Sequence, residues 1–287
     1  MAMVINTNMA AINANRILSN TTIDQQTAME RLTSGKRING AADDAAGLAI
    51  TTKMTTQVMG TDMAIRNAND GIAKIQTADG ASEEITNMLQ RMRELGVQAL
   101  NGTYSTGNRT QMQEEFSALQ EEIDRIAQTT KFNGVNLLNS AAVGASTAKV
   151  FHVGWESGVN NKISMSVLNV GTSALSAGGV TLGSLTLTST ATGTTAASAA
   201  VSKLDVVMSK MNLQRASWGA LQNRLESTVS NLSNVNENIQ GARSRIEDAD
   251  FAKESANLAR TQVLQQAGMS MLSQANQQSQ NVMQLLQ

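Results

Sequence analysis

The side chains that could do acid–base or metal chemistry in this chain are a single histidine and several pairs of carboxylates. His152 lies beside apolar residues and the chain has no cysteine, so a metal site would need carboxylates around this one imidazole. The carboxylates come in close pairs: Glu83 and Glu84, Glu114 and Glu115, Glu121 and Glu122, and Asp248 and Asp250. General acid–base catalysis requires two such groups in different environments of one cleft. Because the pairs lie along polar faces of predicted helices, we interpret them as solvated, and His152 as a strand histidine without a functional role.

The sequence also lacks motifs that would bind zinc, phosphate or nucleic acid. The sequence contains no His-Glu-x-x-His motif and no G-x-x-x-x-G-K-[ST] loop. Ser34-Gly35-Lys36 follows no buried strand, so we interpret it as a turn. Trp155 and Trp218 are too isolated to stack single-stranded nucleic acid, and a net charge of −1 gives no general attraction to nucleic acid or an anionic membrane. The sequence therefore predicts no enzyme, no cofactor, no metal, no nucleic-acid partner and no membrane partner.

The composition instead favours long helices with a narrow buried seam. The chain has no proline, 2% of its residues are aromatic, and its apolar residues are mainly Ala, Leu, Ile, Val and Met. Residues 1–8 have no basic start and no continuous apolar run, so they are not a signal peptide for the general secretory route. No segment approaches the roughly 18 apolar residues of a membrane span. We expect a protein that either stays in the cytosol or leaves by a route without a cleaved signal.

Turn signals divide the chain into helical ends and a different middle. The segments with helical periodicity are 1–33, 43–100, a third helix that ends before Phe132-Asn133-Gly134, and about 204 to 287. In the middle, residues 162–167 alternate polar and apolar side chains as a half-buried strand does, and 180–187 form a second β-like stretch. Residues 188–200, almost entirely Ser, Thr, Ala and Gly, are predicted to be a loop.

Heptad rows in the helical segments predict coiled-coil packing. The strongest row runs from Leu221 to Ile246 at spacings of four and three, and another runs from Leu264 to Leu285. A globular bundle of amphipathic helices is the alternative interpretation on periodicity alone. Because the terminal segments are rich in small and polar residues, neither can cover an apolar face by itself. We expect both ends to be disordered in monomers and to fold when neighbouring subunits supply contacts.

The heptad rows also give candidate residues for an assembly seam that joins the chain ends. The N-terminal candidates are Val4, Ile5, Met9, Ala11, Ile12 and Leu18, and the C-terminal candidates are Leu264, Met271, Ala275, Val282 and Leu285. Small residues such as Gly268 and Ala275 permit close approach of the helices, which suits a dense polymer better than a solitary bundle. We expect this pairing to be weak in a monomer.

Several blocks of the sequence resemble bacterial flagellins, in the order expected for that family. They are residues 1–8, 32–39, 41–50, 132–134, 222–225 and 242–251. The most recognisable of them are Leu32-Thr33-Ser34-Gly35-Lys36-Arg37-Ile38-Asn39 and Ala41-Ala42-Asp43-Asp44-Ala45-Ala46-Gly47-Leu48-Ala49-Ile50. The resemblance covers about 1–140 and 200–287, so it includes most of the chain outside the predicted β region.

This resemblance implies a mainly α fold of long antiparallel helices in a coiled-coil rod, with a small β-hairpin region and paired N- and C-termini. The terminal coiled-coil core domain would comprise 1–45 and 247–287, and the helical rod domain with its β-hairpin 46–175 and 200–246. Residues 176–200 are left as a short variable surface segment, too short and too simple for the folded outer domain that flagellins usually insert there. The rod itself would then form the filament surface.

The resemblance also implies a function: a structural subunit that polymerises into the flagellar filament for swimming motility. Flagellins leave the cell unfolded through the type III export channel, which would explain the missing signal peptide and place the chain in the extracellular flagellum. The absence of Cys and Pro is compatible with that route, since no premature disulfide and no slow prolyl isomerisation would delay folding. The implied partners are further copies in a helical homopolymer, an export chaperone, the filament cap, a junction protein and the host Toll-like receptor five.

A receptor epitope can be carried over from the family residue by residue. Residues 89–97 resemble the helical segment that Toll-like receptor five binds in receptor-activating flagellins. Arg91 and Leu95 on this segment, and Glu115 on the neighbouring helix, match the main contacts. The alternative is that these residues only pack subunits together, and both roles are compatible because the family's epitope overlaps its assembly surface.

Two other classes of protein would have the same helical ends. A hook–filament junction protein would usually have more divergent versions of the blocks at 32–50 and 242–251, so these blocks favour a filament subunit. A catalytic flagellin would carry an enzyme inserted in its middle. The short middle segment and the lone His152 argue against that alternative.

Overall fold

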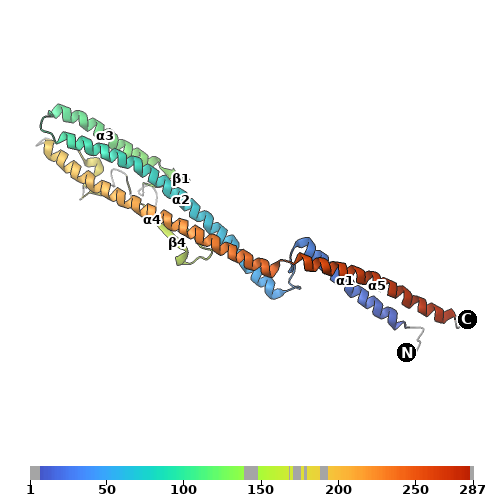
Figure 1. Cartoon of the computed structure of the whole chain (residues 1–287). Coiled ribbons are helices and arrows are strands. Elements are labelled where there is room, and N and C mark those ends of the chain that lie inside the picture. Colours follow the sequence, from blue (N-terminus) through green and yellow to red (C-terminus); the bar gives the residue numbers. More distant parts are fainter. Residues whose placement is uncertain are drawn as a thin grey trace. The chain divides into compact units, whose positions relative to one another are not determined.

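Five long helices dominate the computed structural model, which describes residues 7–138, 148–167, 169–170, 176–177, 180–187 and 193–284 (Figure 1). The helices are α1 (Met9–Ser34), α2 (Ala45–Ala99), α3 (Thr106–Thr129), α4 (Gly193–Glu247) and α5 (Phe251–Gln284). The chain forms two compact units: a terminal unit of residues 1–58 and 237–287, and a central unit of residues 59–236. The predicted mainly α fold with paired chain ends is confirmed. Among the described helices, none combines the length and apolar character that crossing a bilayer requires.

In the terminal unit, α1 and α5 pair along their lengths (Figure 1). α1 begins where the Asn8 side chain accepts a hydrogen bond from the Ala11 amide (3.1 Å), and it ends at Gly35, whose φ of 71° is the left-handed conformation that favours glycine at a helix C-terminus. α5 begins after Asp250, whose carboxylate accepts hydrogen bonds from the Ala252 and Lys253 amides. Local capping therefore sets both ends of α1 and the start of α5.

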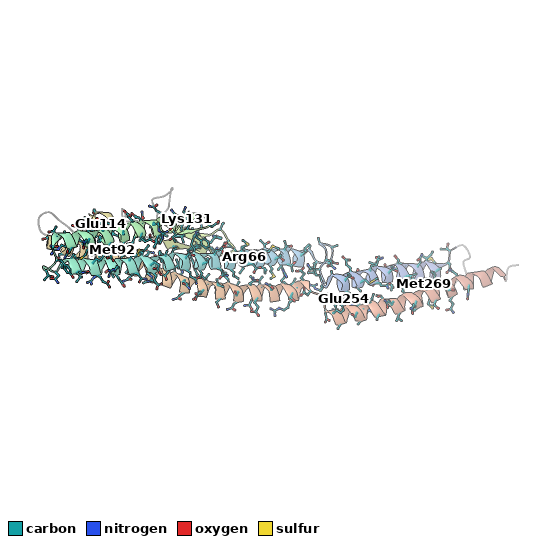
Figure 2. The ribbon with its side chains drawn as sticks, turned by 90° about the horizontal axis from the view of Figure 1, so that it is seen from above. Arg66, Met92, Glu114, Lys131, Glu254 and Met269 are labelled. Atoms are coloured by element: carbon teal, nitrogen blue, oxygen red, sulfur yellow. The ribbon has the colours of Figure 1, made fainter. Side chains whose placement is uncertain are left out.

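The central unit packs α2, α3 and the first part of α4 side by side around one apolar core (Figure 1). Helical periodicity places large residues of each helix inward, and Trp218 of α4 is the largest fully buried side chain. The fully buried side chains also include Ile85, Leu89, Met92, Phe116, Ile123 and Met165. On α2, the heptad-spaced residues Ile85, Leu89, Met92 and Ala99 are all buried, and Figure 2 shows Met92 within this group of helices.

Short antiparallel strand pairs lie against these helices. β1 (Lys131–Phe132) and β2 (Val135–Asn136) flank a turn in which Asn133 and Gly134 have φ values of 49° and 76°, as a tight hairpin requires. β3 (Ala148–His152) pairs with β4 (Lys162–Ser166), and β5 (Ser176–Ala177) with β6 (Val180–Thr181). The strand predicted at 162–167 is confirmed, with Ile163, Met165 and Val167 buried and the residues between them exposed.

The segment expected to be a variable surface piece differs from the prediction in two respects. α4 begins at Gly193 rather than near Leu204, and its first turns bury Ala197 and Ala200. Leu182, Leu185 and Leu187 are buried as well, and the Gln120 amide inside the core donates to the Leu182 carbonyl at 2.6 Å. The run of Ser, Thr and Gly has weak helix propensity, so its helix depends on tertiary packing.

The division of the chain also differs from the boundaries suggested by the turns. The turns near 34–44 and 248–250 lie inside the terminal unit, which takes in the first turns of α2 and the last turns of α4. Arg243 of α4 reaches the Thr55 hydroxyl of α2 at 3.5 Å, so the two helices contact each other beyond the turns. The compact unit is therefore larger than the α1–α5 pair that the heptads described.

Candidate assembly surface

The contact between α1 and α5 is a heptad seam made largely of small and polar side chains. The least exposed positions of each helix recur at alternating spacings of three and four. On α1 they are Ala11, Ala14, Leu18, Thr21, Gln25, Ala28 and Leu32, and on α5 they are Glu254, Leu258, Thr261, Gln265, Gly268, Leu272 and Ala275. Of the predicted seam residues, Ala11, Leu18 and Ala275 belong to these rows.

Close contacts along the seam show that the two helices run antiparallel. The Asn8 side chain donates to the Ala275 carbonyl at 3.0 Å. Further along, Gly268 faces Leu18: a Cβ built on this glycine would lie 3.4 Å from the Leu18 Cδ1, an ordinary contact distance. Small residues in a seam reduce the distance between helices but also reduce the apolar area that each helix buries. The pair is therefore close, with little hydrophobic stabilisation of its own.

Charged residues occupy the end of the seam nearest the turns. Glu254 is buried between the helices (Figure 2), where one carboxylate oxygen lies 3.3 Å from Nη1 of Arg31 and the other accepts from the Asn257 amide at 3.2 Å. A buried ion pair contributes little net stability because both ions lose water. Displacing either helix along the seam would leave a buried charge unpaired, so this pair favours one register.

A short clamp joins the two turns of the terminal unit. Lys36 and Asp248 form an antiparallel β-bridge, the Arg37 amide donates to the Glu247 carbonyl at 2.7 Å, and the Ala249 amide donates to the Gly35 carbonyl at 3.0 Å. The Lys36 ammonium lies 2.5 Å from the Glu247 carboxylate. Each turn thus donates a backbone hydrogen bond to the other, and these bonds hold the two turns together.

The loop that leads into α2 is ordered by two aspartates. Asp43 accepts hydrogen bonds from the Gly40 and Asn39 amides, which lower the pKa of its carboxyl, and the charge of Arg31 lowers it further. Asp44 accepts from the Gly47 amide at 2.8 Å. A Cβ on Gly47 would lie 2.6 Å from the Ile38 Cδ1, so only glycine fits beside this buried isoleucine.

The other predicted seam residues point away from the α1–α5 contact. Leu264 is 52% exposed and Met271 is 60% exposed, and Met9 and Ile12 are exposed on α1. Heptad spacing alone did not distinguish this outward row from the inward one, because apolar residues lie on both faces. Val4, Ile5 and Leu285 lie outside the described residues, as does the side chain of Val282.

Apolar exposure continues around both helices of the pair. Ile17, Ile23 and Met29 of α1 and Phe251, Val263 and Met269 of α5 are exposed as well, and Figure 2 labels Met269 on α5. Soluble monomers rarely expose so many large apolar side chains on one small unit, and such surfaces mark interaction sites. The outward faces of α1 and α5 therefore form the candidate assembly surface.

The proposed receptor residues lie in the central unit and differ in accessibility. The Arg91 Nε donates to the Glu115 carboxylate at 2.8 Å, and its Nη1 contacts Glu94 at 3.0 Å. These hydrogen bonds, that to Glu115 first, raise the pKa of the exposed Arg91. Leu95 is 2% exposed and belongs to the core. Arg91 and Glu115 are thus available on the surface, while the Leu95 side chain is not.

No group of side chains in the described part of the chain is arranged for catalysis. His152 lies in β3, where its carbonyl accepts from the Asn67 amide at 3.0 Å. Nearby, the Lys74 ammonium lies 5.7 Å from the ring centroids of Phe132 and Phe151, and burial lowers its pKa, as does the charge of Lys149. This contact joins two strand pairs to α2. Within the described ranges, no three histidine or acidic side chains gather as metal ligands.

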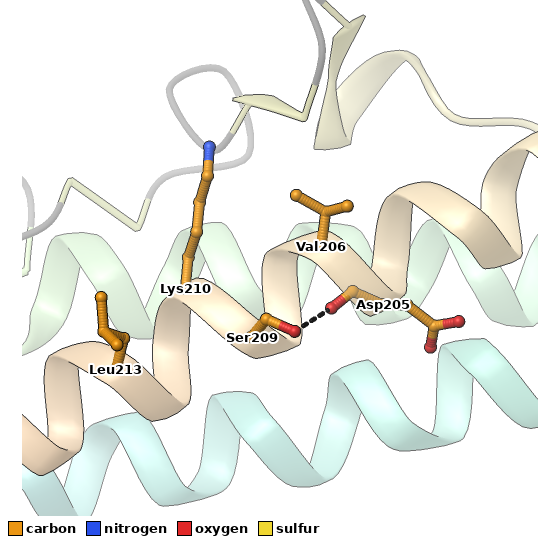
Figure 3. A pocket seen from close by; sticks show the side chains of 5 residues that line it. All are labelled: Asp205, Val206, Ser209, Lys210 and Leu213. Carbon is orange, nitrogen blue, oxygen red and sulfur yellow. Dashed lines mark hydrogen bonds between the residues drawn. The ribbon is translucent and has the colours of Figure 1, made fainter.

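A hollow on α4 is equally unsuited to chemistry (Figure 3). Asp205, Val206, Ser209, Lys210 and Leu213 line it. The Ser209 hydroxyl donates to the Asp205 carbonyl at 2.9 Å, and the Asp205 carboxylate pairs with Arg93 at 2.6 Å. The serine has no histidine partner within these surroundings, and the hollow has no second carboxylate.

Comparison with known proteins accounts for the helices at both chain ends. Residues 5–142 match the model of the bacterial flagellin N-terminal helical region, and residues 201–286 match that of the C-terminal helical region. A flagellin of Halalkalibacterium halodurans is 43% identical over 99% of this chain and 100% of its own length. The chain belongs to the bacterial flagellin family. This flagellin is therefore a structural subunit of the flagellar filament rather than an enzyme.

Other relatives of this flagellin agree in length and in fold. The 31.3 kDa flagellar filament core protein of Treponema maltophilum is 42% identical over 99% of this chain and 100% of its own length. The solved structure of a flagellar hook-associated protein from Vibrio parahaemolyticus superposes with a TM-score of 0.60, over 72% of this chain and 100% of that chain. At 12% identity, this last likeness shows the fold alone.

The structure gives a physical reason for the most recognisable flagellin blocks of the sequence. The blocks at 32–50 and 242–251 supply the clamp: Gly35, Lys36 and Arg37 from one, and Glu247, Asp248 and Ala249 from the other. The positive φ of Gly35 and the ion pair between Lys36 and Glu247 require particular residue types, whereas the backbone hydrogen bonds of the clamp do not. The two blocks of this flagellin meet although they are about 200 positions apart in the sequence.

Proposed function

We propose that this flagellin subunit polymerises through the outward faces of α1 and α5, and that neighbouring copies cover the apolar side chains exposed there. The observation that carries the proposal is the exposure of Met9, Ile12, Leu264 and Met271 on a pair whose own seam is small and polar. Burying apolar surface contributes roughly 25 cal/mol per Å². The contacts between copies would therefore supply the hydrophobic stabilisation that the single pair lacks.

Changing Leu264 to Asp tests this proposal. Leu264 is exposed in the single chain, so Leu264→Asp should leave the helix content and melting of the monomer nearly unchanged. In a filament the new carboxylate would be buried without a partner at a cost of at least about 3 kcal/mol, which raises the critical concentration for polymerisation about a hundredfold. Sedimentation of filaments over a range of protein concentrations measures that change.

A matched variant separates contact from charge. Gln266→Asp adds the same negative charge two positions along the exposed surface of α5 but removes no apolar side chain. Its critical concentration should stay within a few-fold of the original chain. If Leu264→Asp polymerises as readily as Gln266→Asp, the outward row is not a contact between copies.

The exposed apolar surface also bears on export and on partners. A chain that aggregates through α1 and α5 in the cytosol could not reach the tip of the filament, so we infer that an export chaperone covers this surface before type III export. The filament cap and a junction protein would meet the same helices at the two ends of the filament.

The alternative function is that this chain is itself a junction protein. In that case the chain would form short complexes of fixed size instead of filaments that elongate from seeds.

We further propose that the central unit is a ligand of Toll-like receptor five, through Arg91 and Glu115 on adjacent helices. Both side chains are on the surface and are already oriented by their 2.8 Å hydrogen bond. Leu95 would act from the core, by fixing the position of α2, since its side chain is buried. The charged pair, rather than the leucine, would thus be the direct contact.

Arg91→Ala should lower receptor activation by soluble monomers about tenfold or more, since arginines at the centre of interfaces commonly contribute 2 kcal/mol. A receptor reporter assay with a dose series measures the change. Arg125→Ala is the control, because Arg125 is an exposed arginine that likewise pairs with a glutamate, Glu122, at 2.6 Å. Equal activity of the two variants, or a silent unmodified monomer, would contradict this part of the proposal.

A further inference from the structure

The side chains of this flagellin that oxidise most readily are its methionines, and the structure divides them into two sets. The chain has 16 methionines and no cysteine, so no thiolate competes with the thioethers for a two-electron oxidant. Met92, Met165 and Met211 are fully buried in the core of the central unit. Among the described residues, the methionines that are about half exposed or more are Met9 and Met29 on α1, Met269 and Met271 on α5, and Met59 and Met63 on α2 (Figure 2 labels Met92 and Met269).

Four of the exposed methionines lie on the candidate assembly surface. We call Met9, Met29, Met269 and Met271 the outer methionines. Their exposed fractions are 65%, 53%, 56% and 60%, so an oxidant dissolved in water reaches their sulfur atoms in the monomer. A thioether gives an adaptable apolar contact. Copies that covered these side chains would exclude water from them, and the contact would depend on the sulfur staying apolar.

The contacts that hold the single chain together do not depend on exposed thioethers. The inward rows of α1 and α5, which include Leu18 and Leu272, contain no methionine. The clamp between the turns consists of backbone hydrogen bonds and the ion pair of Lys36 with Glu247. In the central unit, the fully buried methionines are shielded from solvent. Oxidation of the exposed set should therefore leave both units folded.

We propose that the outer methionines are an oxidation site through which hydrogen peroxide, a two-electron oxidant, blocks assembly of the monomer. This inference rests on the proposed polymerisation through α1 and α5. The sulfur attacks one peroxide oxygen, the O–O bond breaks, and the second oxygen leaves as water after taking the proton of the first. The sulfur loses two electrons, which the peroxide gains, and the product is a polar sulfoxide. A sulfoxide oxygen that is buried between copies without a donor weakens the contact.

The modification is also reversible. Methionine sulfoxide reductases return the sulfoxide to the thioether, so assembly that is lost by oxidation can be regained without new protein. The exposed thioethers of α1 and α5 thus make assembly dependent on the redox conditions that the monomer meets.

Oxidation of monomers before polymerisation tests the inference. Monomers are treated with hydrogen peroxide until peptide mass spectrometry shows sulfoxide at the outer methionines and none at Met92 and Met165. Their circular dichroism and melting should stay near those of untreated monomers. Their critical concentration, measured by sedimentation, should rise about tenfold or more. A methionine sulfoxide reductase with dithiothreitol should restore the original value. An unchanged critical concentration in folded chains that carry the four sulfoxides would overturn the inference.

Two sets of substitutions locate the effect. The first is Met9→Leu, Met29→Leu, Met269→Leu and Met271→Leu in one chain, because leucine nearly keeps the apolar volume and cannot form a sulfoxide. This chain should polymerise equally well before and after peroxide. The matched set, Met59→Leu with Met63→Leu, removes the exposed thioethers of α2, and peroxide should still block its assembly. Since the four-leucine chain keeps every other methionine, an equal loss of assembly in it would overturn the inference. If that chain does not polymerise at all, the recovery with reductase decides.

Failure of this inference can be told apart from failure of the proposed function. Leu264→Asp adds no thioether, so its effect on polymerisation is independent of any oxidant. If Leu264→Asp blocks polymerisation while oxidised monomers polymerise normally, the oxidation inference is wrong and the assembly surface stands. If both polymerise like the original chain, the proposed function itself is wrong.

Discussion

A chain that ends at Val263 is expected to form no filaments. This truncation removes more than half of α5, including the seam positions Gln265, Gly268, Leu272 and Ala275 and the outward-facing Met271. The first half of α1 would lose its partner and with it the hydrogen bond from Asn8 to the Ala275 carbonyl. Isolated helices of about 12 residues are marginal in water, so that half should unfold. Electron microscopy after seeding with filaments of the full chain measures the effect.

The same truncation should leave the central unit intact, since residues 59–236 form a separate compact unit. Circular dichroism should show a loss of helix confined to the chain ends, with the main thermal transition unchanged. Normal filaments from the truncated chain would contradict the proposed assembly mechanism. Loss of the main transition would instead show that the two units do not fold independently.

Trp218→Ala is expected to be the most destabilising single substitution in the central unit. Trp218 is the largest of the fully buried side chains, and truncation of such a residue costs about 3–5 kcal/mol through lost transfer energy and the cavity that remains. The Ser166 carbonyl keeps one donor, because the Gln214 amide also donates to it at 2.9 Å. The loss is therefore mainly one of packing.

Thermal denaturation of monomers measures this loss, and at about 2–4 °C per kcal/mol the melting temperature should fall by on the order of 10 °C. Trp155→Ala is the matched control: it removes the same atoms from a half-exposed site and should have a much smaller effect. Similar shifts for both variants would show that burial of Trp218 does not stabilise the unit as argued. The comparison thus isolates the contribution that burial of Trp218 makes to stability.

Much of the helical architecture follows from local signals in the sequence. Turn residues end the helices: Gly35 after α1, Asn101-Gly102 between α2 and α3, and Asn133-Gly134 in the first hairpin. At Gly35, Asn133 and Gly134 the effect is local because their left-handed φ favours glycine and asparagine whatever surrounds them. The 3.6-residue periodicity then gives the buried faces of α2 and α3, where large side chains occupy one stripe.

For the terminal helices, local signals did not predict which face turns toward the partner helix. Their apolar residues lie on more than one face, so spacing alone could not say that Leu18 faces α5 while Ile12 faces outward. The inward face combines small residues such as Ala28 and Gly268 with leucines such as Leu18, while other large apolar side chains lie outside it. The face of each helix that turns inward is set by how the two helices pack against each other, and the sequence of either helix alone does not give it.

The sequence by itself therefore determined the helices, their turns and the flagellin resemblance, because these depend on short-range backbone preferences and on blocks of adjacent residues. Tertiary structure alone decided that α4 starts at Gly193, that Leu95 is buried while Arg91 is exposed, and that the blocks at 32–50 and 242–251 clamp together. It also decided that Trp155 is exposed beside Gly60 while Trp218 is buried. Each of these depends on contacts between residues far apart in the chain, whose energies outweigh local propensity.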